Sequence, residues 1–460
     1  MSKFKKMTAV VLSVIMLVCM FAIPAGAANT KSSLIDVALD SVIKGSKSIV
    51  NLGQSLYLVN TENGSDIYRI GEDELKTWRS SGKLTPKKVT LSSDIPEGVY
   101  LRPEEYFTSS KGYAVISYYD SETYSNPVKV VKYDKSSNKI TTVYNVLSDE
   151  RISGMTTDGY ISINSNGNSS IKIVSPNGKT LKTIKDANSS GFTWTSKYGY
   201  YIKWKNNKCT LYCYDTSGKT QKISKTYNSI SIVYARYGGK AYPVGYIYSN
   251  ISYGSDDYDE KDPNKGVYFT TLDGKFTAKM SQSFKVSYDK NNTYSFQPYG
   301  NGFEYLNGSV AVLTLLAKDE NYPNDNPGSS YGTILVSLKN GKFNVLNNDY
   351  MSYSTEDGKI FTVSNYKNDK KIYGYINNKG KKLALSFDSA ADFANGAKYT
   401  VVMKNGSAYV IDRKMNKVSE SLKLKNTDSC QLFNETGTLW GYTTTDEKVH
   451  LVTYKGAIAA

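Results

Sequence analysis

Histidine is almost absent from this sequence, which limits the chemistry that its side chains could perform. The chain of 460 residues has one histidine, His450, in the strand-like segment KVHLVTY. A Ser-His-acid triad would have to use this residue, and a histidine in an alternating strand pattern is usually structural. Paired carboxylates could still act as acid and base, because the sequence does not show which of its 42 acidic residues lie close together.

One segment, GSDDYDEKDPN, concentrates acidic side chains and is the candidate for a metal site. Carboxylate oxygens suit a hard cation such as Ca²⁺, although the spacing matches no EF-hand and the composition also fits an ordinary solvated loop. No phosphate-binding glycine loop of the Walker or Rossmann type is present. We therefore expect no cofactor other than Ca²⁺, with these ligands: Asp256, Asp257, Asp259 and Asp262.

The cysteines form neither a disulfide scaffold nor a zinc site. Cys209 and Cys213 stand four apart in the strand-like segment KCTLYCY, which places their Cα atoms roughly 13 Å apart, beyond disulfide reach. A zinc site is not expected, because His450 is the sole histidine and no second Cys pair is present. We expect buried thiols.

The tryptophans are the candidates for ligand binding, because their rings can stack on sugars or peptide segments at a wet surface. The alternative is packing between strands, where aromatic residues are common. Trp194 and Trp204 lie beside polar, strand-end sequence and are the first to consider. The four candidates are Trp78, Trp194, Trp204 and Trp440.

Short segments with period-2 alternation recur along the chain, each broken by a Gly or Asn turn and resumed with lysine. This pattern predicts β-hairpins, and a period near 40 residues separates many of the turns. Gly178, Gly218, Gly274 and Gly341 are expected to have positive φ. The turn positions are Asn138, Gly178, Gly218, Gly274, Gly341, Gly380 and Asn416.

Each period can hold four short strands, which is the size of a propeller blade. We therefore predict an all-β fold, a single β-propeller of about eight, or seven, four-stranded antiparallel blades over residues 28–460. An elongated stack of hairpins or two sandwich domains is the competing architecture. Helix is expected only at residues 72–79, whereas residues 34–43 fit a short helix or a closing strand. In a closed ring the two ends of the chain should meet in one blade.

Residues 1–27 have the features of a secretory signal peptide. Three lysines precede an apolar segment, and the small residues Ala25, Gly26 and Ala27 follow Pro24. The apolar segment is short for an uncleaved membrane anchor, and no second one follows it. We expect a secreted, extracellular protein without a transmembrane anchor after cleavage.

The formal charge is +15, or +12 without the three leader lysines, so anionic partners are plausible. Nucleic acid would fit the charge but conflicts with export. Lysines that follow the hairpin turns would also begin outer strands, where charge deters edge-to-edge pairing. These lysines include Lys179, Lys219, Lys275 and Lys342.

The segment YGYINNKGKKL followed by FDSAADFANGAKYTVV resembles the bacterial WG β-repeat. Phe387, Ala390, Phe393, Gly396 and Ala397 match its pattern, and further copies over about residues 296–455 include AYVIDRKMNKV and LWGYTTTDEKV. Tyr replaces Trp in the first copy. The resemblance implies an exported or envelope-associated bacterial repeat protein used for binding or scaffolding, without a common catalytic residue set.

Two functions follow as expectations. The first is a secreted, non-enzymatic binding or scaffolding propeller at the bacterial cell surface, with a cell-wall polymer, a polysaccharide or a surface protein as partner. The alternative is an extracellular carbohydrate-active enzyme with paired carboxylates at the propeller centre. Convergence of two or more Asp or Glu at the central opening would favour the enzyme.

Overall fold

The structure of the chain is a computed structural model. It describes residues 33–107, 111–165, 170–185, 187, 194, 197–237, 240–251, 256, 265–286, 294–317, 331–368, 370–425, 429–432, 437–454 and 456. The expected leader, residues 1–27, lies outside the described residues.

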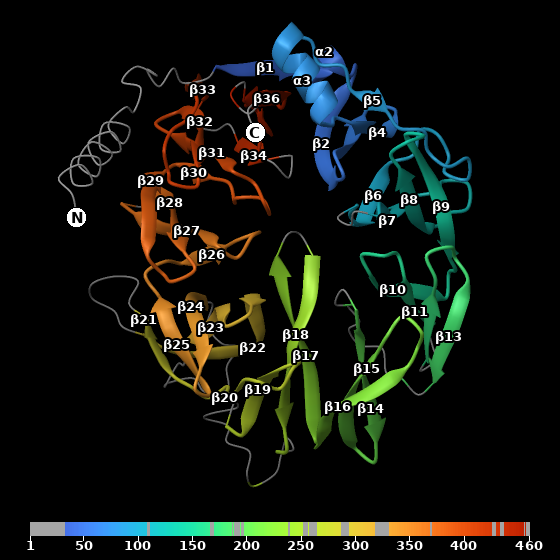
Figure 1. The fold of residues 1–460 in the computed structure, drawn as a ribbon, viewed down its shortest axis with the longest axis vertical. Helices are drawn as coiled ribbons and strands as arrows, with labels where there is room; N and C mark the ends of the chain where they lie inside the picture. Colours follow the sequence, from blue (N-terminus) through green and yellow to red (C-terminus); the bar gives the residue numbers. More distant parts are fainter. Residues whose placement is uncertain are drawn as a thin grey trace, which may run out of the picture.

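Nine antiparallel sheets surround a central opening in the described part of the chain, so the fold is a single all-β propeller (Figure 1). Each sheet is one blade, and we call its strands A to D from the centre outward. Blades 1 to 3 consist of β2 (Ser46–Gly53), β3 (Leu56–Thr61), β4 (Gly64–Arg69) and β5 (Lys87–Lys88); β6 (Leu101–Glu105), β7 (Tyr113–Tyr118), β8 (Val128–Asp134) and β9 (Lys139–Val146); and β10 (Glu150–Met155), β11 (Ile161–Ser165), β12 (Ser170–Val174) and β13 (Thr180–Lys185).

Blade 4 has three described strands, which correspond to B, C and D, and blade 6 has an additional strand, β21, beside its A strand β22. Blades 4 to 6 consist of β14 (Gly199–Lys205), β15 (Lys208–Tyr214) and β16 (Thr220–Tyr227); β17 (Ser229–Tyr237), β18 (Lys240–Ser249), β19 (Val267–Thr271) and β20 (Thr277–Lys279); and β21 (Phe284–Val286), β22 (Tyr294–Asn307), β23 (Val310–Ala317), β24 (Tyr331–Lys339) and β25 (Lys342–Asn347).

The last three blades bring the chain back to its start. They consist of β26 (Ser352–Ser354), β27 (Ile360–Lys367), β28 (Lys370–Asn377) and β29 (Lys382–Phe387); β30 (Ser389–Ala390), β31 (Tyr399–Lys404), β32 (Ser407–Asp412) and β33 (Leu422–Lys423); and β34 (Ser429–Leu432), β35 (Leu439–Thr443), β36 (Val449–Tyr454) and β1 (Leu34–Ala38).

Strand β1 closes the ring, as expected for chain ends that meet in one blade. It pairs antiparallel with β36, from Leu34 opposite Tyr454 to Ala38 opposite His450. The imidazole Nδ1 of His450 lies 3.0 Å from Oδ1 of Asp36, and the Tyr442 hydroxyl donates to Oδ2 of the same carboxylate at 2.8 Å. The sole histidine therefore helps to join the two chain ends, in agreement with a structural role.

The blade count of about eight was too low. The seven turn positions found in the sequence are the C–D turns of blades 2 to 8. Blade 1 has helix α3 (Glu72–Ser81) between its C and D strands, and blade 9 takes its D strand from the N-terminal end. Neither blade therefore has the tight Gly or Asn turn by which the others were counted.

The turn glycines have the predicted backbone conformation. Gly178, Gly218, Gly274 and Gly341 all have positive φ, between 66° and 81°. Many of these turns are also closed by an Asx contact, as where Oδ1 of Asp215 accepts the backbone N–H groups of Ser217 and Lys219. The hairpin interpretation of these segments is confirmed.

The order of the strands gives the ring two distinct faces. Because neighbouring strands in each blade are antiparallel, all A–B and C–D connections lie on one face, and the B–C turns lie on the other. We call these the C–D face and the B–C face. On the C–D face the β17–β18 hairpin continues beyond the pairing of Gly245 with Thr271 and reaches toward the centre of the ring (Figure 1).

Helix is scarce, as predicted. Helix α3 confirms the expectation at residues 72–79, and residues 34–43 form β1 followed by the one-turn α2 (Leu39–Val42). Neither helix in the described part of the chain is long and apolar enough to cross a membrane.

The apolar core is divided among clusters that lie between neighbouring blades. One cluster joins blades 5 and 6 through Phe269, Phe303 and Phe343, whose rings lie 4.4 to 6.2 Å apart between centroids. Each blade is thus stabilised by the next, so the turns that touch a neighbouring blade should be sensitive to substitution.

Gly380→Ala is expected to destabilise the protein more than Gly274→Ala, by about 1–3 kcal/mol. Both glycines have positive φ, which costs an alanine about 1 kcal/mol. A Cβ at Gly380 would overlap the carbonyl oxygen of Leu346 in blade 6, whereas a Cβ at Gly274 meets nothing within 4 Å. Urea denaturation of both variants measures the difference, and equal losses would contradict a close contact between the blade 7 turn and blade 6.

Candidate functional site

Three of the four tryptophan candidates are buried and cannot stack on an external ligand in this arrangement. Trp78, Trp194 and Trp440 are at most 1% exposed. Trp194 packs edge-on against Tyr214, and its Nε1 donates to Oγ of Ser162 at 3.0 Å. Trp204 is 53% exposed at the end of β14, so it alone of the four offers a ring to a ligand.

The metal candidates lie almost entirely outside the described residues. Asp256 is described and exposed, whereas Asp257, Asp259 and Asp262 fall outside that part of the chain. Among the described residues, no group of three or more His, Cys, Asp or Glu is arranged to hold a metal ion. The Ca²⁺ site stays a prediction.

Cys209 and Cys213 are buried, as expected. Both are free thiols, and burial raises the pKa of each. A thiol with a raised pKa is a poor nucleophile.

The structure brings together acidic residues that the sequence did not single out. Glu356 and Asp357 lie in the A–B connection of blade 7, and Asp392 lies in the equivalent connection of blade 8. We call these three residues the carboxylate cluster. Because each connection follows an innermost strand, the cluster lies on the C–D face beside the central opening.

Asp357 is the fixed member of the cluster. Its side chain is 2% exposed and forms an ion pair with Arg413 of blade 8. Its Oδ1 accepts the backbone N–H groups of Lys359 and Ile360 at 2.8 and 3.1 Å. The Arg413 Nε donates to the carbonyl oxygen of Ala397 at 2.6 Å. Asp357 therefore joins blades 7 and 8 through its ion pair with Arg413, while backbone hydrogen bonds hold its side chain in place.

Glu356 and Asp392 are the members able to exchange a proton. Desolvation raises the pKa of Glu356 to about 7, and the negative charges of Asp392 and Asp357 add to the shift. Desolvation also raises the pKa of Asp392, although a hydrogen bond from Ser354 opposes the shift. Ser354 Oγ donates to Asp392 at 2.9 Å. A carboxylic acid that keeps its proton near neutral pH beside a second carboxyl can act as a general acid or base.

One signal in the sequence could have identified this pair. Glu356 and Asp392 stand 36 positions apart, close to the spacing of the hairpin turns around them. Equivalent positions in consecutive blades of a ring lie side by side, so acidic residues at that spacing are expected to meet. Each residue alone looks like part of an ordinary polar turn.

The free energy of unfolding is expected to fall as pH rises from about 4.5 to about 7, by about 1 kcal/mol from Glu356. The folded chain holds a proton in that range that the unfolded chain has released, because the pKa of Glu356 is raised on folding. The contribution is complete below pH 4.5 and is lost as pH rises through 7. The expected change in the free energy of unfolding is small because part of the Glu356 side chain is exposed to solvent, which screens its charge, although protein surrounds most of its carboxyl.

Denaturation of Glu356→Gln across this pH range tests the assignment. The variant should lose that part of the pH dependence, whereas Glu420→Gln, which replaces an exposed glutamate of blade 8 outside the cluster, should keep it. Identical pH profiles for the parent and Glu356→Gln would show that its carboxyl has an ordinary pKa.

A second feature of the C–D face is a series of exposed lysines at larger radius. Every C–D turn from blade 2 to blade 8 has at least one, and the D strand it precedes is the outermost of its blade. We call these residues the lysine ring: Lys135, Lys179, Lys219, Lys275, Lys339, Lys342, Lys379, Lys381 and Lys414.

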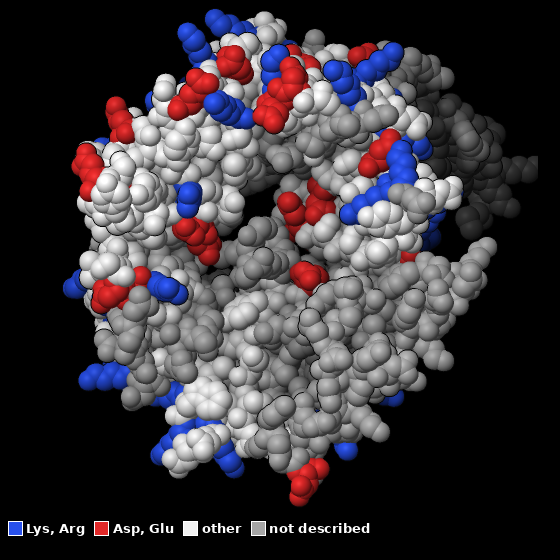
Figure 2. Space-filling view, turned by 180° about the vertical axis from the view of Figure 1, so that it is seen from behind, with Lys and Arg blue, Asp and Glu red and all other residues white. Residues whose placement is uncertain are grey.

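The turns of the B–C face are less uniformly basic, and Figure 2, which shows this face, has acidic side chains among the Lys and Arg of its rim. Lys205 and Lys208 lie there in blade 4, but Glu62, Asp120 and Glu122 lie in the corresponding connections of blades 1 and 2. The C–D face thus combines a basic perimeter with an acidic centre.

No family model matches the chain, and no curated protein matches it. Among solved structures it is similar to an oligogalacturonate lyase in complex with manganese, at 10% identity over 78% of this chain and 97% of that chain, with a TM-score of 0.35. It is also similar to the β-propeller domain of the Trilobed protease from Pyrococcus furiosus (10% identity, 70% and 98% covered, TM-score 0.31) and to TolB from Acinetobacter baumannii (11%, 77% and 79%, 0.25). Similarities this low carry no argument about function, and the resemblance to the WG β-repeat depends on the quoted residues alone.

Proposed function

We propose that the chain is a secreted, non-enzymatic binding or scaffolding propeller that holds an anionic cell-wall polymer on its C–D face. The lysine ring is the observation that carries the proposal. Seven consecutive blades present exposed ammonium groups on the same face, so an extended polyanion could contact several blades at once. Many weak contacts of this kind add up to a useful affinity and are screened by salt.

Retention of the purified protein on isolated cell wall, measured across a salt series, tests this proposal. Contacts between exposed charges are screened over roughly 8 Å at physiological ionic strength, so rising salt should release the protein progressively. Retention that resists salt but is lost in Trp204→Ala would indicate ring stacking on a polysaccharide instead. Retention insensitive to both would point to a surface protein as partner.

The carboxylate cluster favours a second candidate, an extracellular carbohydrate-active enzyme. Glu356 would donate a proton to the leaving oxygen, and Asp392 would act as the second carboxylate. Release of reducing ends from wall polysaccharide by the parent, abolished in Glu356→Gln and retained in Glu420→Gln, would establish this activity. No release from any wall fraction leaves binding as the function.

A further inference from the structure

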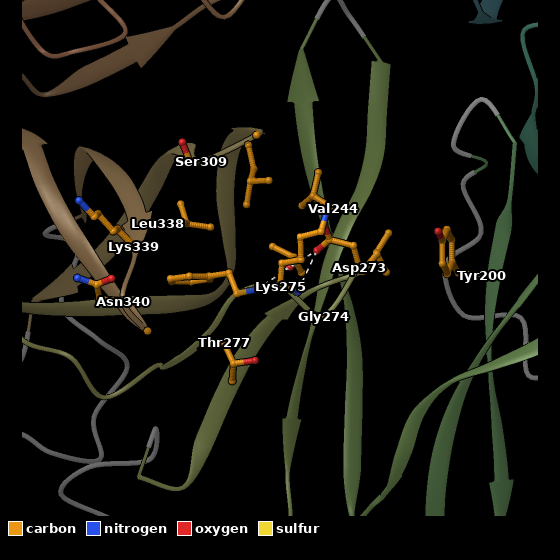
Figure 3. Close-up of a pocket in the computed structure, with 16 residues that line it drawn as sticks. Tyr200, Val244, Asp273, Gly274, Lys275, Thr277, Ser309, Leu338, Lys339 and Asn340 are labelled. Carbon is orange, nitrogen blue, oxygen red and sulfur yellow. Dashed lines mark hydrogen bonds and ion pairs between the residues drawn. The ribbon is translucent and has the colours of Figure 1, made fainter.

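A broad cleft of about 1010 Å³ lies between blades 5 and 6 on the C–D face (Figure 3). The C–D turn of blade 5 forms one wall, and the A–B and C–D turns of blade 6 form the other. Backbone hydrogen bonds hold the second wall in place, since the Leu338 N–H donates to the carbonyl oxygen of Ser309 at 2.8 Å. The cleft is thus framed by three tight turns.

The floor of the cleft is apolar. Leu306 and Leu338 reach it from blade 6, and Val244, Leu272 and Phe276 reach it from blade 5. Leu306 and Leu338 belong to the core between the two blades, and Val244 and Phe276 pack against it. Leu272 packs against the neighbouring core between blades 4 and 5, so the floor is a fixed surface. The volume of the cleft is similar to that of pockets that bind small organic ligands.

The rim of the cleft has one cation that no acidic group neutralises among the described residues. Lys275 forms an ion pair with Asp273 of its own turn at 3.2 Å. Lys339 is exposed on the opposite wall and has no ion pair in the described part of the chain. Figure 3 shows Leu338 and Lys339 on the blade 6 side of the cleft, and Val244, Asp273 and Lys275 on the blade 5 side.

A second cleft on the C–D face has lysines but lacks an apolar floor. The cleft of about 400 Å³ between blades 1 and 2 is lined by Lys111, Lys132 and Lys135, but its lining includes no aliphatic Leu, Ile or Val. A polyanion could use either cleft, whereas only the cleft between blades 5 and 6 matches a ligand that is apolar at one end and anionic at the other.

We propose that this cleft binds a soluble amphiphilic carboxylate of about the size of a medium-chain fatty acid. The apolar body lies on Leu306, Leu338 and Phe276, where each buried CH₂ contributes about 0.8 kcal/mol. The carboxylate lies beside the ammonium group of Lys339. This site is separate from polymer binding, although Lys275 and Lys339 also belong to the lysine ring.

Displacement of a fluorescent dye tests the site. Anilinonaphthalene sulfonate, which is apolar and anionic, should bind the folded protein, and decanoate should displace it. Acetate lacks the apolar body and decyltrimethylammonium has the wrong charge, so neither should compete at the same concentration. Equal displacement by decanoate and the cationic amphiphile would reduce the site to an apolar surface and overturn the proposal.

Two variants locate the binding, and one is the matched control. Lys339→Glu should weaken decanoate binding about tenfold, whereas Lys342→Glu, its cross-strand partner outside the cleft, should change it less than about twofold. Ser309→Trp should block the cleft and abolish binding. Thermal melts confirm that all three variants fold.

The result is distinguishable from failure of the proposed function. Ser309→Trp should keep salt-sensitive retention on cell wall, because it removes no lysine. Decanoate binding that survives in both Lys339→Glu and Ser309→Trp would place it elsewhere, and the absence of decanoate and dye binding to the parent would also overturn the proposal.

Discussion

Arg79→Ala is expected to lower the free energy of unfolding by about 3 kcal/mol. The Arg79 side chain is fully buried in helix α3 of blade 1, where its Nη1 lies 2.7 Å from Oε1 of Glu72. Its Nε donates to Oγ1 of Thr453 on β36 at 3.1 Å, so this one residue connects blade 1 to the closing blade 9. Alanine would leave a cavity and remove that bond.

Two variants separate packing from charge. Arg79→Met keeps most of the side-chain volume and should lose less than half as much stability as Arg79→Ala. The Nη2 of Arg79 has no hydrogen-bond partner, so removing it leaves no group unpaired. Lys76→Ala removes an exposed cation from the same helix and should change stability by less than about 0.5 kcal/mol. Equal losses for Arg79→Ala and Lys76→Ala in urea denaturation would refute the role of Arg79.

Replacing four lysines of the ring by glutamate is expected to weaken polyanion binding by at least about 100-fold. The substitutions Lys179→Glu, Lys219→Glu, Lys342→Glu and Lys381→Glu each lie in a different C–D turn. Each removes an attraction and adds a repulsion, so the slope of the logarithm of affinity against the logarithm of salt should fall by roughly one per lysine. Titration with linear polyphosphate at several salt concentrations measures both quantities.

The matched control changes the same charge on the other face. Lys205, Lys208, Lys367 and Lys404 lie in or beside B–C turns and are exposed. Their replacement by glutamate lowers the net charge by the same amount and should weaken binding much less. If both quadruple variants lose affinity equally, binding follows net charge alone and the C–D face has no special role.

The sequence predicted the fold class because the repeating signal is local. A turn such as Asp273-Gly274 needs a positive φ whatever surrounds it, so the hairpins could be located one by one. The number of blades could not be predicted in this way, because blades 1 and 9 have no such turn. The sequence predicts helix α3 but not its place between two strands of a blade. The residues of β1 likewise do not indicate which strand it pairs with.

The candidate site was less predictable because it depends on contacts between blades. Glu356 and Asp392 influence each other only through the angle between blades 7 and 8, which no single hairpin encodes. Trp194 has polar neighbours in the sequence, which favoured exposure, yet the hydrogen bond of its Nε1 to Ser162 allows it to be buried in the core. Trp204, two residues from Ile202 on the same strand, is exposed because it lies where β14 ends.

The closing strand also has a consequence for how the chain folds. The contact between Asp36 and His450 joins residues 414 apart, so it carries a large loop-closure entropy and should form after the hairpins, which are local. Before closure, the C strand β36 of blade 9 has an open edge in an otherwise assembled arc. The β1 strand of a second molecule could pair with that edge as well as its own could. Refolding at high protein concentration should therefore produce strand-exchanged dimers, and dilution during refolding should favour closed monomers.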